Sequence, residues 1–73
     1  MKILIIEDET SLSNSIASYL KADNYLCEIA GNYKMALDKI ESFDYDCMLL
    51  DITLPDGNGL NVLKELKKLN IRL

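Results

Sequence analysis

The feature that most constrains the fold is an uninterrupted apolar run at the start of the chain, Ile3–Ile6. Such a run is typical of a strand covered on both faces, as in parallel sheets, whereas a half-exposed antiparallel strand alternates apolar and polar residues. Two later segments, Leu26–Ala30 and Tyr45–Leu50, have the composition of further strands. We therefore expect a small parallel sheet in the α/β class.

The segments after each strand carry apolar residues at helical spacing. Thr10 or Ser11 is placed to cap a first helix and Asn32 a second, while a third is expected from Leu60 to Leu69. The core-facing stripes expected in the first two helices are Leu12, Ile16, Tyr19 and Leu20, then Tyr33, Ala36, Leu37 and Ile40. The resulting βαβαβα order favours right-handed crossovers between parallel strands.

Charge and composition exclude several classes of partner. The net charge is −4 and the chain has no histidine, so we expect no direct binding of nucleic acid by this segment. Cys27 and Cys47 each lie within an apolar segment, as packed thiols of a reduced protein do. Neither a signal peptide nor a membrane span is recognisable, so the expected location is cytoplasmic.

Carboxylates follow two of the three predicted strands. Glu7, Asp8 and Glu9 come directly after the first, and Asp51 comes directly after the third. Ligands of open parallel sheets gather at the carboxyl ends of the strands, so Glu7, Asp8 and Asp51 converge if these strands are neighbours. Crowded carboxylates need a cation, and Mg²⁺ suits oxygen ligands of this kind. For Glu9 we expect only a favourable position at a helix N-terminus.

Asp51 is the candidate nucleophile because it stands alone at its strand end. A carboxylate beside a divalent ion can accept a phosphoryl group and form an aspartyl phosphate. The lack of histidine and the apolar setting of both cysteines argue against zinc. The loop that follows, 51–58, contains Pro55 and Gly57 and is expected to form turns.

The two acidic segments, Ile5–Glu9 and Leu49–Gly59, together strongly resemble the receiver domain of bacterial two-component response regulators. The resemblance covers residues 1–73, and the loop resembles most the OmpR/PhoB-like subfamily with a winged-helix DNA-binding output domain. It implies a flavodoxin-like, doubly wound parallel sheet of order 2-1-3-4-5. These residues would form its (βα)3 portion, with strand order 2-1-3.

The resemblance also implies roles for individual residues. Asp51 would be the phosphoacceptor, taking its phosphoryl group from the phosphohistidine of a sensor histidine kinase. Glu7 and Asp8 would serve the Mg²⁺ ion together with Asp51, and Thr53 would supply a backbone carbonyl ligand. The kinase would dock on the first helix and the loops around the site. The chain would thus be a signalling module and not an enzyme.

Family receivers carry two further strand–helix units, with a Ser or Thr and a Lys that complete the site. We therefore expect residues 1–73 to be a truncated receiver domain, either part of a longer protein or able to associate with copies of itself through the exposed third strand. The alternative function is a divalent-metal-binding or protein-interaction module that has lost phosphotransfer. A phosphatase of the haloacid dehalogenase type needs a second Asp where this chain has Thr53.

Overall fold

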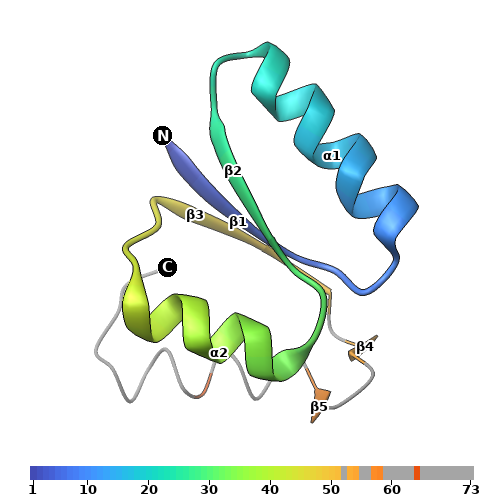
Figure 1. Cartoon of the computed structure of the whole chain (residues 1–73), viewed down its shortest axis with the longest axis vertical. Helices are drawn as coiled ribbons and strands as arrows, with labels where there is room; N and C mark the ends of the chain where they lie inside the picture. The colour runs from blue at the N-terminus through green and yellow to red at the C-terminus, as the bar shows by residue number, and fades with distance from the viewer. Residues whose placement is uncertain (52, 55–56, 59–63, 65–73) are drawn as a thin grey trace.

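The computed structural model describes residues 1–51, 53–54, 57–58 and 64. Its centre is a three-stranded parallel sheet of β1 (Lys2–Ile6), β2 (Leu26–Ala30) and β3 (Cys47–Leu50) in the order β2-β1-β3 (Figure 1). The α/β class is the one that the sequence predicts, and the strand order is the one that the resemblance to receiver domains implies.

Strand β1 is central because it is the most apolar segment and is covered on both faces. Its four residues Ile3–Ile6 are between 0% and 4% exposed. Ile3 lies opposite Cys27 in β2 and opposite Cys47 in β3, so both neighbours run in register with it. Burial of a continuous branched run is the main apolar contribution to this fold.

Helix α1 (Thr10–Ala22) covers one face of the sheet. Its buried residues are Ser13 and Ala17, and Ala17 packs with Ile3 and Ile5. The predicted stripe is therefore partly wrong, since Leu12 is 43% and Tyr19 74% exposed while Ile16 and Leu20 are half-buried. Small side chains at the contact let the helix approach the sheet closely, which hydrophobicity alone does not reveal.

The ends of α1 also differ from the prediction. The N-cap residue is Glu9, one position before Thr10, and it makes no side-chain capping bond. Its carbonyl already accepts the Ser13 amide at 3.0 Å, so the first helical turn begins there without a hydroxyl cap. At the other end Asn24 adopts φ 69°, a left-handed conformation in which asparagine often ends a helix.

Helix α2 (Tyr33–Ser42) covers the opposite face of the sheet and begins as predicted. The Asn32 side chain accepts the Met35 amide at 2.8 Å, so asparagine is the N-cap. Ala36 and Ile40 are buried and pack with Leu4 and Ile6. The two helices thus bury alternate side chains of β1.

The segment after β3 contains two short strands, β4 (Thr53–Leu54) and β5 (Gly57–Asn58), which pair antiparallel. They were expected as part of a loop.

The start of the third strand was predicted too early, since β3 begins at Cys47 and not at Tyr45. The predicted third helix lies almost wholly outside the described residues, of which Lys64 is helical. Among the described helices, none is long and apolar enough to cross a membrane.

We predict that Leu4→Ala lowers the free energy of unfolding by about 2–5 kcal/mol, because it removes a fully buried side chain between the sheet and α2. Leu26→Ala, the same substitution at a strand residue that is 67% exposed, serves as the matched control. Urea denaturation followed by circular dichroism measures both. Equal losses at the two positions would contradict the assignment of the core.

Candidate functional site

Backbone hydrogen bonds bring the acidic residues to one edge of the sheet. The Asp51 amide donates to the Ile6 carbonyl at 2.9 Å, directly beyond the last paired residues of β1 and β3. The Glu7 amide donates to the Ala30 carbonyl at 3.1 Å, so it stays attached to the end of β2. Both acids are therefore held at the carboxyl ends of the strands, where parallel sheets bind ligands.

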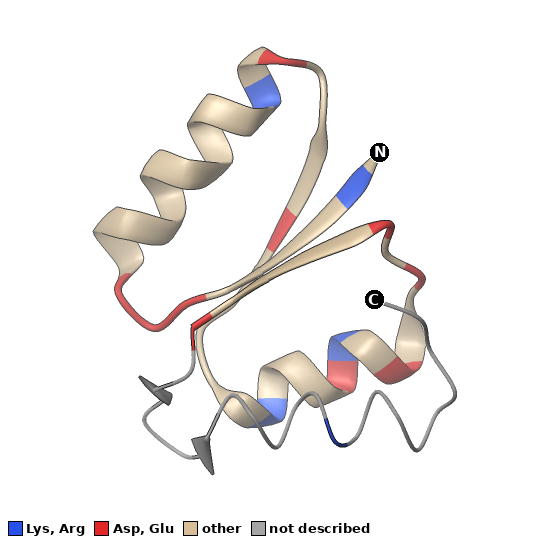
Figure 2. Cartoon of the chain, turned by 180° about the vertical axis from the view of Figure 1, so that it is seen from behind, with Lys and Arg blue, Asp and Glu red and all other residues tan. Residues whose placement is uncertain are grey.

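Glu7, Asp8 and Asp51 form a compact cluster. One carboxylate oxygen from each lies within 4.8 Å of the others. Glu7 and Asp51 are half-buried and Asp8 is exposed, so the cluster opens to solvent on one side. In Figure 2 the acidic segments after β1 and after β3 meet at this end of the sheet. The sequence expectation that these three acids converge agrees with this geometry.

The conformation of Glu7 depends on the start of α1. Its Oε1 accepts the Glu9 amide at 3.2 Å, which is the largest single effect on its pKa and lowers it. Desolvation and the negative charges of Asp51 and Asp8 act in the opposite direction and leave the pKa of Glu7 raised above its usual value. The cluster therefore repels itself when it is fully ionised, and a cation placed among its oxygens relieves that repulsion.

A cleft of about 310 Å³ lies beside the cluster, on the side of the sheet that α1 partly covers. Glu7 and Asp51 form its polar edge, and Ile5, Ile16 and Leu49 line much of the remainder. The cleft therefore places charged oxygens next to apolar side chains at the carboxyl ends of the strands.

Thr53 is the first residue of β4, two positions beyond Asp51. The expectation that the backbone carbonyl of Thr53 is a ligand of Mg²⁺ stays a prediction. Glu9 lies outside the cluster of three acids and is the N-cap of α1. Sequence reasoning did not anticipate that its amide holds Glu7, because a backbone donor leaves no signature in the choice of side chain.

Comparison with known proteins identifies the class. Residues 3–73 match the family model of the response regulator receiver domain, and the chain belongs to that family. Receiver domains are signalling modules, so no family of classical enzymes is indicated.

Two relatives illustrate the similarity. The response regulator ArlR of Staphylococcus epidermidis is 39% identical over 66 residues, which are 90% of this chain and 30% of ArlR. The transcriptional regulatory protein PmrA of Pectobacterium parmentieri is 39% identical over 70 residues, which are 96% of this chain and 32% of PmrA. The chain therefore spans less than a third of the length of these relatives.

Solved structures share the fold. The response regulator TrrA of Thermotoga maritima, crystallised in complex with Mg²⁺-BeF, is 34% identical with a TM-score of 0.86, and the match covers 92% of this chain and 58% of TrrA. A CheY-like receiver domain protein of Methanospirillum hungatei is 37% identical with a TM-score of 0.90, over 93% of this chain and 54% of the other.

We predict that Glu7→Gln raises the free energy of unfolding of the metal-free protein at pH 7 by up to about 1 kcal/mol. This is the size of the interaction between two exposed charges. The folded pKa of Glu7 is raised, so its contribution to stability is present below the unfolded pKa and is lost as pH rises through the folded pKa. The amide keeps an oxygen for the Glu9 amide and lacks the charge. Thermal unfolding in excess chelator tests this, and the gain should vanish below about pH 4, where the unfolded carboxyl is protonated. If Glu7→Gln were less stable than the wild type at pH 7, the proposed repulsion among the clustered carboxylates would be contradicted.

Proposed function

We propose that this chain is a phosphoacceptor module in which Asp51 takes a phosphoryl group from the phosphohistidine of a sensor histidine kinase. The observation that carries the proposal is the convergence of Glu7, Asp8 and Asp51 within 4.8 Å at the carboxyl ends of β1 and β3. Membership of the receiver family supports the same chemistry.

The donor set fits magnesium. All three side chains offer carboxylate oxygens, the ligands that Mg²⁺ prefers, and the exposed side of the cluster leaves room for water and phosphate oxygens. Glu7, Asp8, Asp51 and the Thr53 carbonyl would hold the ion. When bound, the ion offsets negative charge on the phosphoryl oxygens. The Mg²⁺-BeF complex of TrrA is in line with this assignment.

In the reaction a carboxylate oxygen of Asp51 forms a bond to phosphorus while the bond from phosphorus to the imidazole nitrogen of the donor breaks. The leaving imidazole keeps the electron pair of that bond, so charge and atoms balance. The hydrogen bond from the Asp51 amide to Ile6 fixes the main chain of the nucleophile. Binding in a fixed orientation is the principal way a protein accelerates phosphoryl transfer.

Residues 1–73 would act as part of a longer protein that controls transcription. PmrA is named a transcriptional regulatory protein, and this chain matches only 32% of its length. A net charge of −4 gives these residues no basic surface for DNA, so contact with DNA would fall to an output domain elsewhere in the protein.

We predict that the protein gains one phosphoryl group when it is incubated with Mg²⁺ and acetyl phosphate, and that Asp51→Asn abolishes the gain. The amide is a poor nucleophile toward phosphorus, so the loss should be complete. Intact-mass spectrometry measures it. Asp23→Asn, an exposed acid at the far end of α1, is the control and should react like the wild type.

Two further conditions make this experiment decisive. Chelation of Mg²⁺ should also prevent the gain, since the acidic cluster cannot offset phosphoryl charge by itself. If the wild-type protein binds Mg²⁺ and gains no phosphoryl group from acetyl phosphate or from phosphorylated kinases, the alternative of a metal-binding or interaction module is correct.

We also propose that the 73-residue chain by itself associates through β3. This strand lies at the edge of the described sheet, has four apolar residues and no charge, and leaves Leu49 40% exposed. Unprotected edge strands of this kind pair with other chains. Leu49→Lys should reduce the association measured by sedimentation velocity, while Tyr19→Lys on α1 should not. A monomer at all concentrations would refute the proposal.

A further inference from the structure

The position of Asp51 depends on how β3 is aligned with β1. Strand β3 consists of the four apolar residues Cys47–Leu50, whose side chains alternate between the two faces of the sheet. A slip by two residues keeps every side chain on its own face, so apolar burial alone discriminates weakly between the observed and the slipped alignments.

Such a slip would destroy the acidic cluster. A strand advances about 3.3 Å per residue, so two residues displace Asp51 by roughly 6.6 Å along the strand. The clustered oxygens lie within 4.8 Å of one another. The proposed phosphoacceptor site therefore exists only in the observed alignment, and something outside the four apolar residues must specify it.

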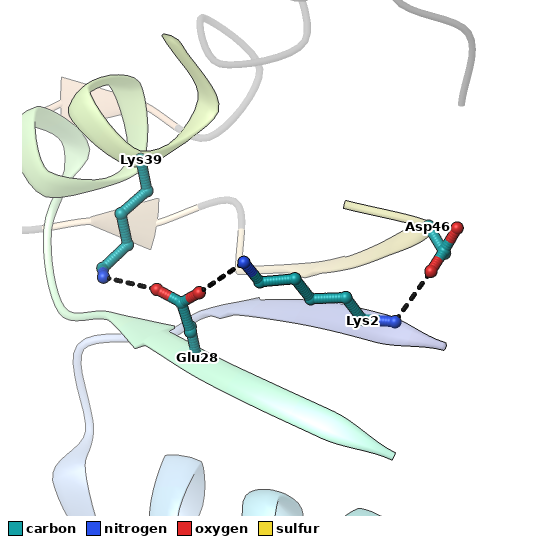
Figure 3. A network of polar contacts seen from close by, with 4 residues as sticks. All are labelled: Lys2, Glu28, Lys39 and Asp46. Carbon is teal, nitrogen blue, oxygen red and sulfur yellow. Dashed lines mark hydrogen bonds and ion pairs between the residues drawn. The ribbon is translucent and has the colours of Figure 1, made fainter. Parts of the chain in front are cut away.

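The residue before β3 makes the contacts that do so. The Lys2 amide donates to Oδ2 of Asp46 at 2.8 Å, and the Asp46 amide donates to the Lys2 carbonyl at 2.8 Å. Figure 3 shows the first of these bonds at the start of β1. Asp46 thus joins the first residue of β1 by its main chain and by its carboxylate, at the opposite end of β3 from Asp51.

The Lys2 side chain is held as well. Its ammonium lies 3.0 Å from Glu28 in β2 and sits over the rings of Phe43 and Tyr45, at 4.9 and 5.1 Å from their centroids. Glu28 also accepts the Lys39 ammonium of α2 at 2.9 Å. Lys39 and Lys2 together lower the pKa of Glu28 to about 2, so the carboxylate is ionised at neutral pH. The two aromatic residues that precede Asp46, Phe43 and Tyr45, therefore both contact the Lys2 side chain.

The two possible slips differ in what opposes them. A slip in one direction places Asp51 opposite Ile5, at the position that Leu49 holds, and moves Asp46 beyond the start of β1, which breaks both of its bonds to Lys2. A slip in the other direction places Asp46 opposite Leu4, at the half-buried position that Met48 holds, and brings the exposed Asp44 level with Lys2. Burial of an unpaired carboxylate is costly, so Asp46 resists this second slip both by its bonds to Lys2 and by its charge.

We propose that Asp46 is a positioning residue, which fixes the alignment of β3 with β1 and thereby places Asp51 beside Glu7 and Asp8. It acts from the opposite end of the strand and touches neither the acids nor a phosphoryl donor. The inference about alignment stands on the geometry of Lys2 and Asp46, and its consequence for phosphorylation rests on the proposed function.

The test compares variants of the full-length protein. Asp46→Ala removes the acceptor and the charge, Asp46→Asn keeps an oxygen for the Lys2 amide, and Asp44→Ala changes an exposed acid two residues away. With Mg²⁺ and acetyl phosphate, Asp46→Ala should lose at least about tenfold in initial rate, since small misplacements of a reacting group have effects of this size. Asp46→Asn should recover most of the rate, and Asp44→Ala should match the wild type.

A second measurement reads the alignment itself. In the wild type, nuclear Overhauser effects between main-chain protons should join Ile3 to Cys47. In Asp46→Ala a population should join Ile3 to Tyr45 instead. A variant that only loses stability, such as Ile40→Val on the buried face of α2, should keep the wild-type contacts and rate. If Asp46→Ala does not fold, Asp46→Val, with a strand-forming apolar side chain, decides by the same measurements.

The outcomes separate the two proposals. If Asp46→Ala and Asp46→Val retain only the contact between Ile3 and Cys47, the alignment inference is overturned whatever their rates. If the wild type gains no phosphoryl group, the proposed function fails, and the main-chain contacts still decide the role of Asp46.

Discussion

The fold depends on the pairing of β1 with a parallel neighbour on each side. This arrangement removes Ile3–Ile6 from water almost completely and gives α1 and α2 one face each. Burial of branched apolar side chains is the main driving force of folding for such a sheet. The acidic site is a consequence of the same pairing, because the ends of β1 and β3 meet only when these strands are adjacent.

The acidic residues of the sheet fall into two groups with different surroundings. At the carboxyl ends, Glu7 and its neighbours carry like charges that oppose one another and are available to a cation. In the middle of β2, opposite Leu4, Glu28 is neutralised by Lys2 and Lys39, so it contributes to structure and not to a site. Glu28, paired with two lysines, serves the structure, whereas the crowded acids at the carboxyl ends are those for which we propose the chemistry.

Much of this could be predicted from the sequence, and the errors have physical causes. The strands, the cap at Asn32 and the convergence of the acids followed from apolar runs and local chemistry. The buried face of α1 did not, because Ser13 and Ala17 are chosen for close packing and hydrophobicity ranks Leu12 and Tyr19 above them. A hydrophobicity pattern indicates which residues prefer to be buried, and it does not indicate how closely a helix packs against a sheet.

The sequence by itself determined that β1 is buried on both faces and that carboxylates end two strands, since these facts need only the order of residues. The tertiary structure alone decided the alignment of β3, because a slip of two residues keeps Cys47–Leu50 on their own faces of the sheet and their apolar run discriminates only weakly between alignments. The pair formed by Lys2 and Asp46 connects residues 44 positions apart in the chain. A contact between two polar residues far apart in the chain produces no periodic pattern in the sequence, and only folding brings the two residues together.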